Sequence, residues 1–253
     1  MNYGLWLSAA GLQANQYRQA LIANNLANAN TVGFKHDLAV IRERPTAVVE
    51  TGRRRFAHDL LDGLTGGSVV APTYTTFAQG PIEPTSRALD VAIDGQGFFT
   101  IRTGEGTRYT RDGRFTIDRA GRLVTTAGGR PVLDAGGNEI VVATGVQAEP
   151  PRIDERGRVM QGERVVAQMG LVDFADKQRL RKIGSNLFDA MGEPPIASRA
   201  KLRPGAVEGS TVSPVLAMAT MIEVSRAYQL NANLISMQDQ MNGRAASDIG
   251  RIG

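Results

Sequence analysis

Cysteine is absent from the 253-residue chain, and only two histidines are present, His36 and His58. Without cysteine there can be no disulfide, thiolate metal site, iron–sulfur cluster or cysteine nucleophile. Neither histidine belongs to an HExxH sequence, so a histidine-based zinc site would need further ligands from carboxylates. The sequence therefore predicts neither a metal nor a cofactor.

Aromatic residues and long apolar runs are also scarce. Phe, Trp and Tyr make up 6% of the chain, whereas glycine is frequent, at 29 residues. This mixture predicts many tight turns rather than a thick aromatic core. There is no apolar run of about 18 residues, the length that a transmembrane helix needs. Residues 1–6 lack the basic segment and the apolar core of a cleavable secretory signal.

The positive charge of the chain is small and is carried mainly by arginine. The formal net charge is +4 with a pI near 9.7, and only four of the 29 basic residues are lysines. A nucleic-acid-binding module usually concentrates such charge on one face. Here the arginines are spread along the chain, mostly beside acidic residues, which favours a solvated surface of mixed charge. A basic nucleic-acid-binding module stays as the remote alternative.

The sequence contains no recognisable catalytic constellation. A Ser–His–acid triad would have to use His36 or His58, and no GxSxG sequence is present. The phosphate-binding pattern GxxxxGK[ST] is also missing. Pairs of carboxylates occur in any chain of this length and do not by themselves indicate a glycosidase. We therefore expect a protein that is not an enzyme.

Residues 2–30 are predicted to form one long helix with a narrow apolar seam. Gly4 and Gly11 weaken this helix, each by about 1 kcal/mol relative to alanine. Gly33 is expected to end the element in a left-handed conformation. The residues of this helix that we expect at an assembly interface are Leu5, Leu12, Ile22 and Leu26.

A second long helix is predicted from Ser213 to about Met241, with a stop at Asn242 and Gly243. Ser213 is a favourable N-cap, and Pro214 suits the first helical position. Two adjacent apolar rows make the stripe too wide for one partner helix. We expect this helix to contact the N-terminal helix and other copies of the chain, the alternative being packing on its own β domain. The first row contains Met221, Val224, Tyr228 and Ile235, and the second contains Leu230, Leu234, Met237 and Met241.

Between the helices the apolar pattern changes to a period of two, which predicts short strands, for example over residues 91–101. Asp112 and Gly113 lie between two alternating runs and predict a hairpin. The pattern Asp-x-x-Gly recurs before further apolar runs and predicts turns with a left-handed glycine. Because no DxDxDG loop is present, we do not expect calcium binding. The three repeats begin at Asp118, Asp134 and Asp154.

Residues 42–72 have the weakest pattern of the chain. They contain the densest basic cluster, residues 53–55, and the glycine-rich tract 63–67. We expect an extended, flexible connector that becomes ordered only against a neighbour. Residues 186–212, which prolines interrupt, are expected to form further short strands and loops.

These patterns together predict an α+β fold. The long N- and C-terminal helices are expected to pack as a coiled-coil-like pair, with a central, mainly antiparallel β domain. The expected domains are residues 1–30 together with 213–253, an extended connector over 31–80, and a β-rich domain over 81–212.

The segment 23–35, ANNLANANTVGFK, resembles the N-terminal signature of the bacterial flagellar rod, hook and hook-associated family. Residues 89–113 are similar to the entry of the β domain in that family, and residues 221–241 resemble its C-terminal helix. The three matches span the chain in the family's order. The residues carried over as the family motif are Asn24, Asn25, Leu26, Asn28, Thr31, Gly33 and Phe34.

Within the family, residues 208–222 and the ending 242–245 are similar to the proximal-rod branch. The distal-rod branch is the alternative. Hook proteins are much longer than this chain, so length argues against that branch.

The resemblance implies a structural subunit of the flagellar rod. Such a subunit is exported by the flagellar type III apparatus without signal cleavage and assembles in the periplasm with other rod proteins and with its own copies. The terminal helices would form the inner tube, the β domain would lie outside, and the rod would transmit torque to the hook. A peptidoglycan-active enzyme, suggested only by that location, is the competing enzymatic class.

Overall fold

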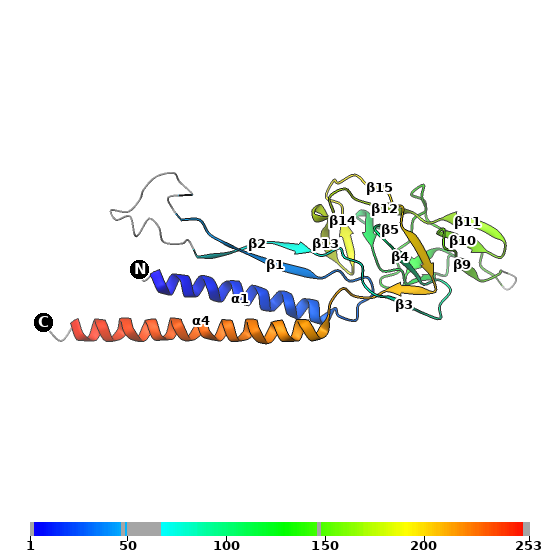
Figure 1. Ribbon diagram of the computed structural model, residues 1–253. Coiled ribbons are helices and arrows are strands. Elements are labelled where there is room, and N and C mark those ends of the chain that lie inside the picture. Colours follow the sequence, from blue (N-terminus) through cyan, green and yellow to red (C-terminus); the bar gives the residue numbers. More distant parts are fainter. Residues whose placement is uncertain (1–2, 47–48, 50–66, 146–147, 250–253) are drawn as a thin grey trace. The chain divides into compact units, whose positions relative to one another are not determined.

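The structure is a computed structural model that describes residues 3–46, 49, 67–145 and 148–249. The chain forms two compact units (Figure 1). The helical unit contains Met1–Ala27, Asp37–Tyr74 and Ser213–Gly253. The β unit contains Asn28–His36 and Thr75–Val212.

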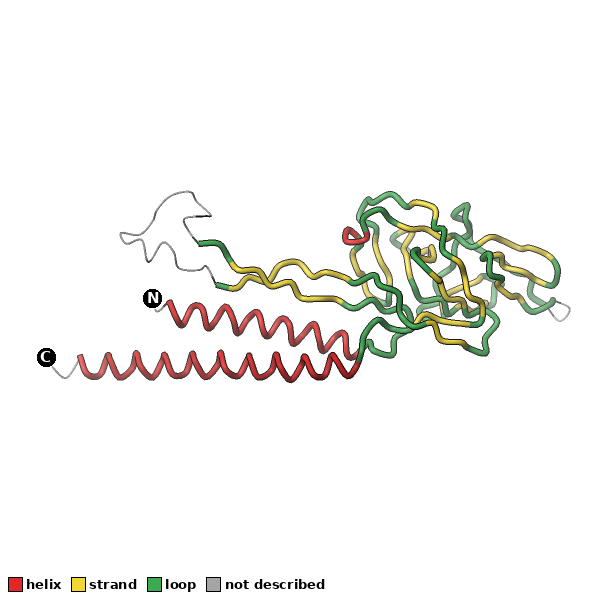
Figure 2. The backbone as a smooth tube through the Cα atoms, in the orientation of Figure 1, coloured by secondary structure: helices red, strands yellow, loops and turns green. Residues whose placement is uncertain are grey.

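The helical unit is built on two long helices, α1 (Tyr3–Ala27) and α4 (Pro214–Ile249), which pack side by side. The helices run in opposite directions, so the start of α1 and the end of α4 lie at the same end of the pair (Figure 2). The missing side chain of Gly11 permits a close approach, since a Cβ there would lie 3.1 Å from Asn231 Nδ2. The prediction of two terminal helices is confirmed, and coiled-coil geometry stays a prediction.

Both helices end elsewhere than predicted. Helix α1 ends at Ala27, three residues early. Helix α4 starts at Pro214 as predicted, and the N–H of Ala217 donates to the Ser213 carbonyl over 2.9 Å. It then passes Gly243 and continues to Ile249, so the predicted stop was wrong. Arginine and alanine follow Gly243, and their high helix propensity offsets the roughly 1 kcal/mol cost of one glycine.

The helical unit also contains a two-stranded sheet of β1 (Asp37–Glu43) and β2 (Ser68–Thr75). Strand β1 packs against α1. Next to β2, Gly67 lies under an aromatic ring, because a Cβ there would come within 2.8 Å of Trp6 Cζ3. The flexible connector predicted over 42–72 falls mainly on residues 47–48 and 50–66, which lie outside the described residues, as do the basic cluster and His58.

The β unit is made of short strands, and every strand pairing recorded for its described residues is antiparallel. The mainly antiparallel β region and the strands predicted within 186–212 are therefore confirmed. The strands are β3 (Ile82–Pro84), β4 (Val91–Asp94), β5 (Phe98–Thr103), β6 (Gly106–Thr110), β7 (Phe115–Ile117), β8 (Leu123–Thr125), β9 (Pro151–Ile153), β10 (Arg158–Gln161), β11 (Arg164–Gln168), β12 (Leu171–Asp173), β13 (Arg181–Gly184), β14 (Leu187–Asp189), β15 (Ile196–Ala197), β16 (Lys201–Pro204) and β17 (Ala206–Glu208), with a 3-10 turn at Lys177–Arg179.

The largest sheet has six strands in the order β13-β14-β6-β5-β12-β15. A three-stranded sheet has the order β11-β10-β9, and the pairs β16-β4, β17-β3 and β7-β8 complete the unit. Successive side chains of β5 point to opposite faces. Phe99 and Ile101 therefore enter the larger apolar core, whereas Phe98 enters a separate cluster.

This second cluster is aromatic, which the composition did not lead us to expect. Four phenylalanines and Tyr109 lie in it, with ring centroids as close as 4.8 Å between Tyr109 and Phe174. A low overall aromatic content says nothing about local concentration, so the expectation of tight turns rather than a thick aromatic core did not anticipate this cluster. The aromatic members are Phe77, Phe98, Tyr109, Phe174 and Phe188.

The three Asp-x-x-Gly turns are confirmed. Gly121, Gly137 and Gly157 have φ values of 82°, 80° and 76°. Each glycine N–H donates to the carbonyl of the aspartate three residues earlier, over 3.1, 3.0 and 2.9 Å. In each turn one carboxylate oxygen accepts backbone N–H groups two and four residues later. The carboxylates thus stabilise their own turns.

The hairpin predicted at Asp112 and Gly113 was wrong. Strand β6 pairs with β5 and β14, whereas β7 pairs with β8. The Asp112 carboxylate binds the Arg114 guanidinium over 2.7 and 2.9 Å, and the Gly113 carbonyl accepts from Val91 N–H over 3.0 Å. A Cβ on Gly113 would lie 1.7 Å from Val91 O. This glycine therefore permits close backbone approach rather than a hairpin turn.

Candidate assembly surface

Helix α1 covers one apolar row of α4, whereas the other row is exposed. In the first predicted row, Val224 is 1% exposed, and the remaining members Met221, Tyr228 and Ile235 are half-buried. Asn231, which contacts Gly11 of α1, lies one heptad after Val224 and therefore on the same face. The first row thus lies on the side of α4 that α1 covers.

The second predicted row faces away from this contact. Leu230 is 64% exposed, Leu234 43% and Met241 68%, and Met237 is exposed as well. Leu230, Leu234 and Met237 line a shallow groove of about 570 Å³ together with two small polar residues. The row has no partner among the described residues of the chain.

The exposed apolar surface extends farther toward the start of α4 than we predicted. Val215, Leu216, Met218 and Ile222 are also exposed, and they lie on the same side of the helix at about 100° per residue. Their spacing was readable in the sequence, but we assigned them only to the family resemblance. We call all eight residues the exposed stripe: Val215, Leu216, Met218, Ile222, Leu230, Leu234, Met237 and Met241.

The predicted interface residues of α1 are less accessible. Leu5, Leu12, Ile22 and Leu26 are all half-buried. The positions of α1 that are fully buried are small or polar, which suits a close approach of the neighbouring elements. These positions are Ser8, Ala14, Asn15 and Asn25.

Two asparagines of the family motif stabilise the chain after α1. Asn25 Nδ2 donates to the Asp37 carbonyl over 2.7 Å, and its Oδ1 accepts from Asp37 N–H over 3.1 Å. This pair of bonds fixes the start of β1 beside α1. Asn28 accepts from Thr31 twice, at its backbone carbonyl and at its side-chain oxygen, both over 3.1 Å. Asn24, the remaining asparagine of the family motif, is exposed.

Gly33 and Phe34 belong to the β unit rather than to the end of α1. Gly33 has the predicted positive φ, +71°, but it lies six residues beyond α1, so its predicted role as the helix cap was wrong. A Cβ on Gly33 would lie 2.6 Å from the Arg111 carbonyl carbon. Phe34 is buried, and Lys182 Nζ lies 4.5 Å from the centre of its ring.

A buried charge cluster, which we did not predict, follows the motif. Lys35 Nζ donates to Glu208 Oε1 over 2.5 Å, and Arg111 Nη1 donates to Glu208 Oε2 over 3.2 Å. All three side chains are fully buried. Their pairings span 173 and 97 residues of sequence, which no local pattern reveals.

The cluster holds two cations and one anion, and burial dominates its electrostatics. Burial lowers the pKa of Lys35, and the nearby Glu208 carboxylate opposes part of that effect. Burial likewise lowers the pKa of Arg111, against the attraction of Glu208. Arg111 also lies over the Phe98 ring, with its guanidinium carbon 5.2 Å from the ring centre. Its Nε and Nη2 have no hydrogen-bond partner among the described residues.

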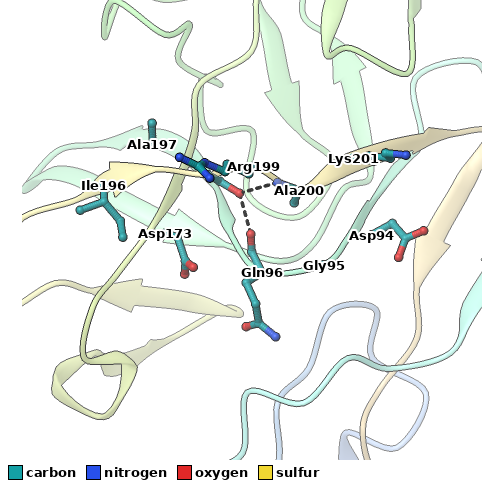
Figure 3. A pocket seen from close by; sticks show the side chains of 10 residues that line it. Asp94, Gly95, Gln96, Asp173, Ile196, Ala197, Arg199, Ala200 and Lys201 are labelled. Carbon is teal, nitrogen blue, oxygen red and sulfur yellow. Dashed lines mark hydrogen bonds between the residues drawn. The ribbon is translucent and has the colours of Figure 1, made fainter.

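The β unit carries an open surface pocket of about 750 Å³ beside β4 and β15 (Figure 3). Ser198 Oγ closes its rim by donating to the Gln96 carbonyl over 2.5 Å and accepting from Ala200 N–H over 3.1 Å. The two carboxylates of the pocket are paired with bases, Asp94 with Arg203 at 2.8 Å and Asp173 with Lys177 at 3.0 Å. The pocket therefore does not bring unpaired carboxylates together.

The wider charge pattern fits the mixed surface that we expected. Arginines of two Asp-x-x-Gly turns pair with the aspartates of their own turns, at 2.8 Å for Arg122 and Asp118 and 2.7 Å for Arg158 and Asp154.

In the part of the chain that the structure describes, no cluster of three or more potential metal-ligating side chains occurs. No helix within the described residues has the length and hydropathy to cross a membrane. His36 bonds through Nδ1 to Thr211 Oγ1 over 2.8 Å.

Family models match the chain in three places. Residues 7–35 match the flagella basal body rod protein model, residues 92–161 the D1 domain of flagellar hook protein FlgE/F/G, and residues 203–248 the C-terminal model of flagellar basal body rod FlgEFG proteins. The last match contains the whole exposed stripe, and the first contains the asparagines of the motif.

Curated relatives match over nearly the whole chain. The flagellar basal-body rod protein FlgF of Caulobacter vibrioides is 36% identical, with 92% of this chain and 91% of the relative covered. The rod protein FlgG of Borreliella burgdorferi is 33% identical, with 97% and 98% covered. FlgF of Mesorhizobium japonicum is 33% identical, with 99% of both covered. The chain therefore belongs to the family of flagellar basal-body rod proteins.

Proposed function

We propose that this protein is a non-enzymatic structural subunit that builds part of the flagellar rod by self-assembly in the periplasm and transmits torque to the hook. The observation that carries the proposal is the exposed stripe of α4, which lies on the side of the helix that α1 does not cover. An apolar surface of this length on a family member whose relatives are named as rod proteins supports burial between subunits.

The energetics of the exposed stripe suit a helical assembly. Full burial of a large aliphatic side chain contributes about 1.5–3 kcal/mol, so eight such side chains supply on the order of 10 kcal/mol for each subunit. Ordering the helices offsets part of this gain. A stripe that contacts a different surface on the next copy gives a heterologous contact, which builds open helical tubes rather than closed pairs. We place the predicted interface residues of both helices, Leu5, Leu12, Ile22 and Leu26 with the two rows of α4, in this inner tube.

We further propose that the subunit belongs to the proximal part of the rod. Relatives named FlgF and FlgG both match, so the support is the resemblance of residues 208–222 and 242–245 to the proximal branch. Electron microscopy of basal bodies from a strain lacking this chain tests both statements. We expect a rod truncated near its base, whereas loss of only the distal part would assign the chain to the distal branch. A complete rod would contradict the proposed function itself.

The proposed partners are neighbouring rod proteins, other copies of this chain and the flagellar type III export apparatus. Export without signal cleavage is proposed from the resemblance to the flagellar rod family. Deleting residues 2–30 is expected to keep the protein in the cytoplasm. Finding that variant in the periplasm would mean that the export information lies elsewhere in the chain.

A further inference from the structure

We infer that the buried cluster of Lys35, Glu208 and Arg111, which lies inside the β unit, is the joint that fixes the chain segments through which force leaves that unit toward the helices. The inference rests on the proposed function, because a torque-transmitting subunit needs a stiff path from one unit to the other. The chain passes between the two units at residues 27/28, 36/37, 74/75 and 212/213. Every covalent path for force therefore leaves the β unit through the segments 28–36, 75–80 and 206–212.

Backbone hydrogen bonds join these three segments to one another inside the β unit. Gly33 N–H donates to the Glu208 carbonyl over 2.7 Å, and Thr211 N–H donates to the Phe34 carbonyl over 3.1 Å. Thr76 N–H donates to the His36 carbonyl over 2.9 Å. The segments that lead out of the β unit are thus connected before they leave it.

The buried charges tie the same three segments. Besides Glu208, Lys35 Nζ donates to the Ala78 carbonyl over 2.6 Å, and Glu208 Oε1 accepts from Gly80 N–H over 2.8 Å. Lys35 belongs to the first segment, Ala78 and Gly80 to the second and Glu208 to the third. A Cβ on Gly80 would lie 2.3 Å from Gly209 O, which shows how closely the second and third segments approach.

Arg111 connects this junction to the sheet. It follows β6 directly, and its Nη1 donates both to Glu208 and to the Gly95 carbonyl over 2.9 Å. Buried ion pairs are weak devices for stability, because apolar residues of the same volume often replace them without loss. They do fix geometry, since each charge must keep its partners to stay buried. The cluster therefore suits a joint that must not shift under load.

Lys35→Met and Arg111→Met form a matched pair of test variants. Each removes one buried cation and leaves the other opposite Glu208, so both variants keep one cation and one anion in the cluster. Only Lys35→Met removes the side-chain ties to Glu208 and Ala78 from the first segment. Arg111→Met leaves those ties in place.

Hydrogen exchange of the full-length protein measures the joint directly. In Lys35→Met we expect the amides of Gly33, Thr76 and Thr211 to exchange about tenfold faster, because losing a charged buried hydrogen bond lowers the free energy of local opening. The amides of β5 and β6 should keep their rates. Arg111→Met should change the three junction amides much less. The inference would be overturned if the three junction amides of Lys35→Met exchanged at the parent rate. It would also be overturned if exchange rose uniformly, β5 and β6 included, or rose equally at the junction in both variants.

Motility under load tests the consequence in cells. Lys35→Met cells are expected to assemble complete rods, visible in electron micrographs, and to lose more speed than the parent as the viscosity of the medium rises. The inference would be overturned if Lys35→Met cells swam as fast as the parent in viscous medium. It would also be overturned if these cells failed to assemble rods, because the cluster would then serve assembly. The proposed function is tested separately by removing the whole chain, so the two failures are distinguishable.

Discussion

Asn25 of α1 and Asp37 of β1 are joined by two hydrogen bonds, one in each direction, between a side-chain amide and a backbone. Nδ2 donates over 2.7 Å and Oδ1 accepts over 3.1 Å, and Asn25 is buried. The amide thus binds both backbone groups of Asp37 at the start of β1. This arrangement gives a physical role to an asparagine that the sequence offered only as part of a motif.

Asn25→Ala should loosen the start of β1. It leaves the Asp37 N–H and carbonyl without these partners, which typically costs about 1–3 kcal/mol for a buried group. Hydrogen exchange at the Asp37 amide should rise, while exchange in the β unit stays the same. Asn30→Ala, at an exposed position three residues beyond α1, serves as the control and should leave the Asp37 amide unchanged. Equal protection of Asp37 in the parent and in Asn25→Ala would contradict this role.

Glu208→Gln should destabilise the β unit strongly. It leaves the buried cations Lys35 and Arg111 without their anion, and uncompensated buried charge costs about 3–5 kcal/mol. Urea unfolding of the purified protein followed by the β-sheet signal measures the change. Glu83→Gln, an exposed position on the paired strand β3, is the control and should stay within about 0.5 kcal/mol of the parent.

Asp118 should contribute to the pH dependence of stability in acid. The backbone N–H of Arg122 is the largest cause that lowers its pKa below the usual 3.8. A carboxyl group whose pKa is lower in the folded state stabilises the fold above its unfolded pKa and loses that contribution as the pH falls through its folded pKa. Thermal unfolding of Asp118→Asn should therefore depend less on pH below about 4 than that of the parent. An identical slope in both proteins would show that the turn contributes nothing to acid sensitivity.

The isolated monomer should have terminal helices that a protease removes more readily than the β unit. The buried positions of α1 are small or polar, and the exposed stripe of α4 has no partner among the described residues, so we expect the helices to be less stable than the β unit. Isolated helices are marginal in water. Limited proteolysis should remove residues before about 30 and after about 213 and leave a β-rich fragment. If the helices resisted the protease as well as that fragment does, the folding of the helices would not depend on assembly.

Local patterns predicted much of this fold, whereas long-range partners were not readable. The start of α4 and the three Asp-x-x-Gly turns depend on residues close in sequence, and the structure confirms them. The hairpin at Asp112 and the cap at Gly33 were wrong, because these residues serve contacts with Val91 and Arg111 that lie far away in sequence. The Lys35 and Glu208 pair, 173 residues apart, was unpredictable for the same reason.

The candidate surface was predicted in part. Helical spacing alone separated the row containing Val224, which α1 covers, from the row containing Leu234, which stays exposed. The predicted surface was too short because Val215, Met218 and Ile222 were assigned only to the family resemblance, and the helix face that they share was not considered. Spacing also could not show that Leu5, Leu12, Ile22 and Leu26 are half-buried, since that depends on the other elements around α1.

The most direct test of the account is the motility of cells that carry Leu234→Asp. A carboxylate at this position becomes buried between subunits, at a cost of several kcal/mol, and the residues one turn away, Leu230 and Met237 among them, include no base to pair with it. Circular dichroism of the purified variant should show the β unit unchanged, and Leu234→Met, which keeps an apolar side chain of similar volume at the same position, should have a far milder effect. The account predicts that Leu234→Asp protein is stable and exported but builds no rod, so that the cells do not swim. Normal swimming of these cells, or loss of the β-sheet signal in the purified variant, would contradict it.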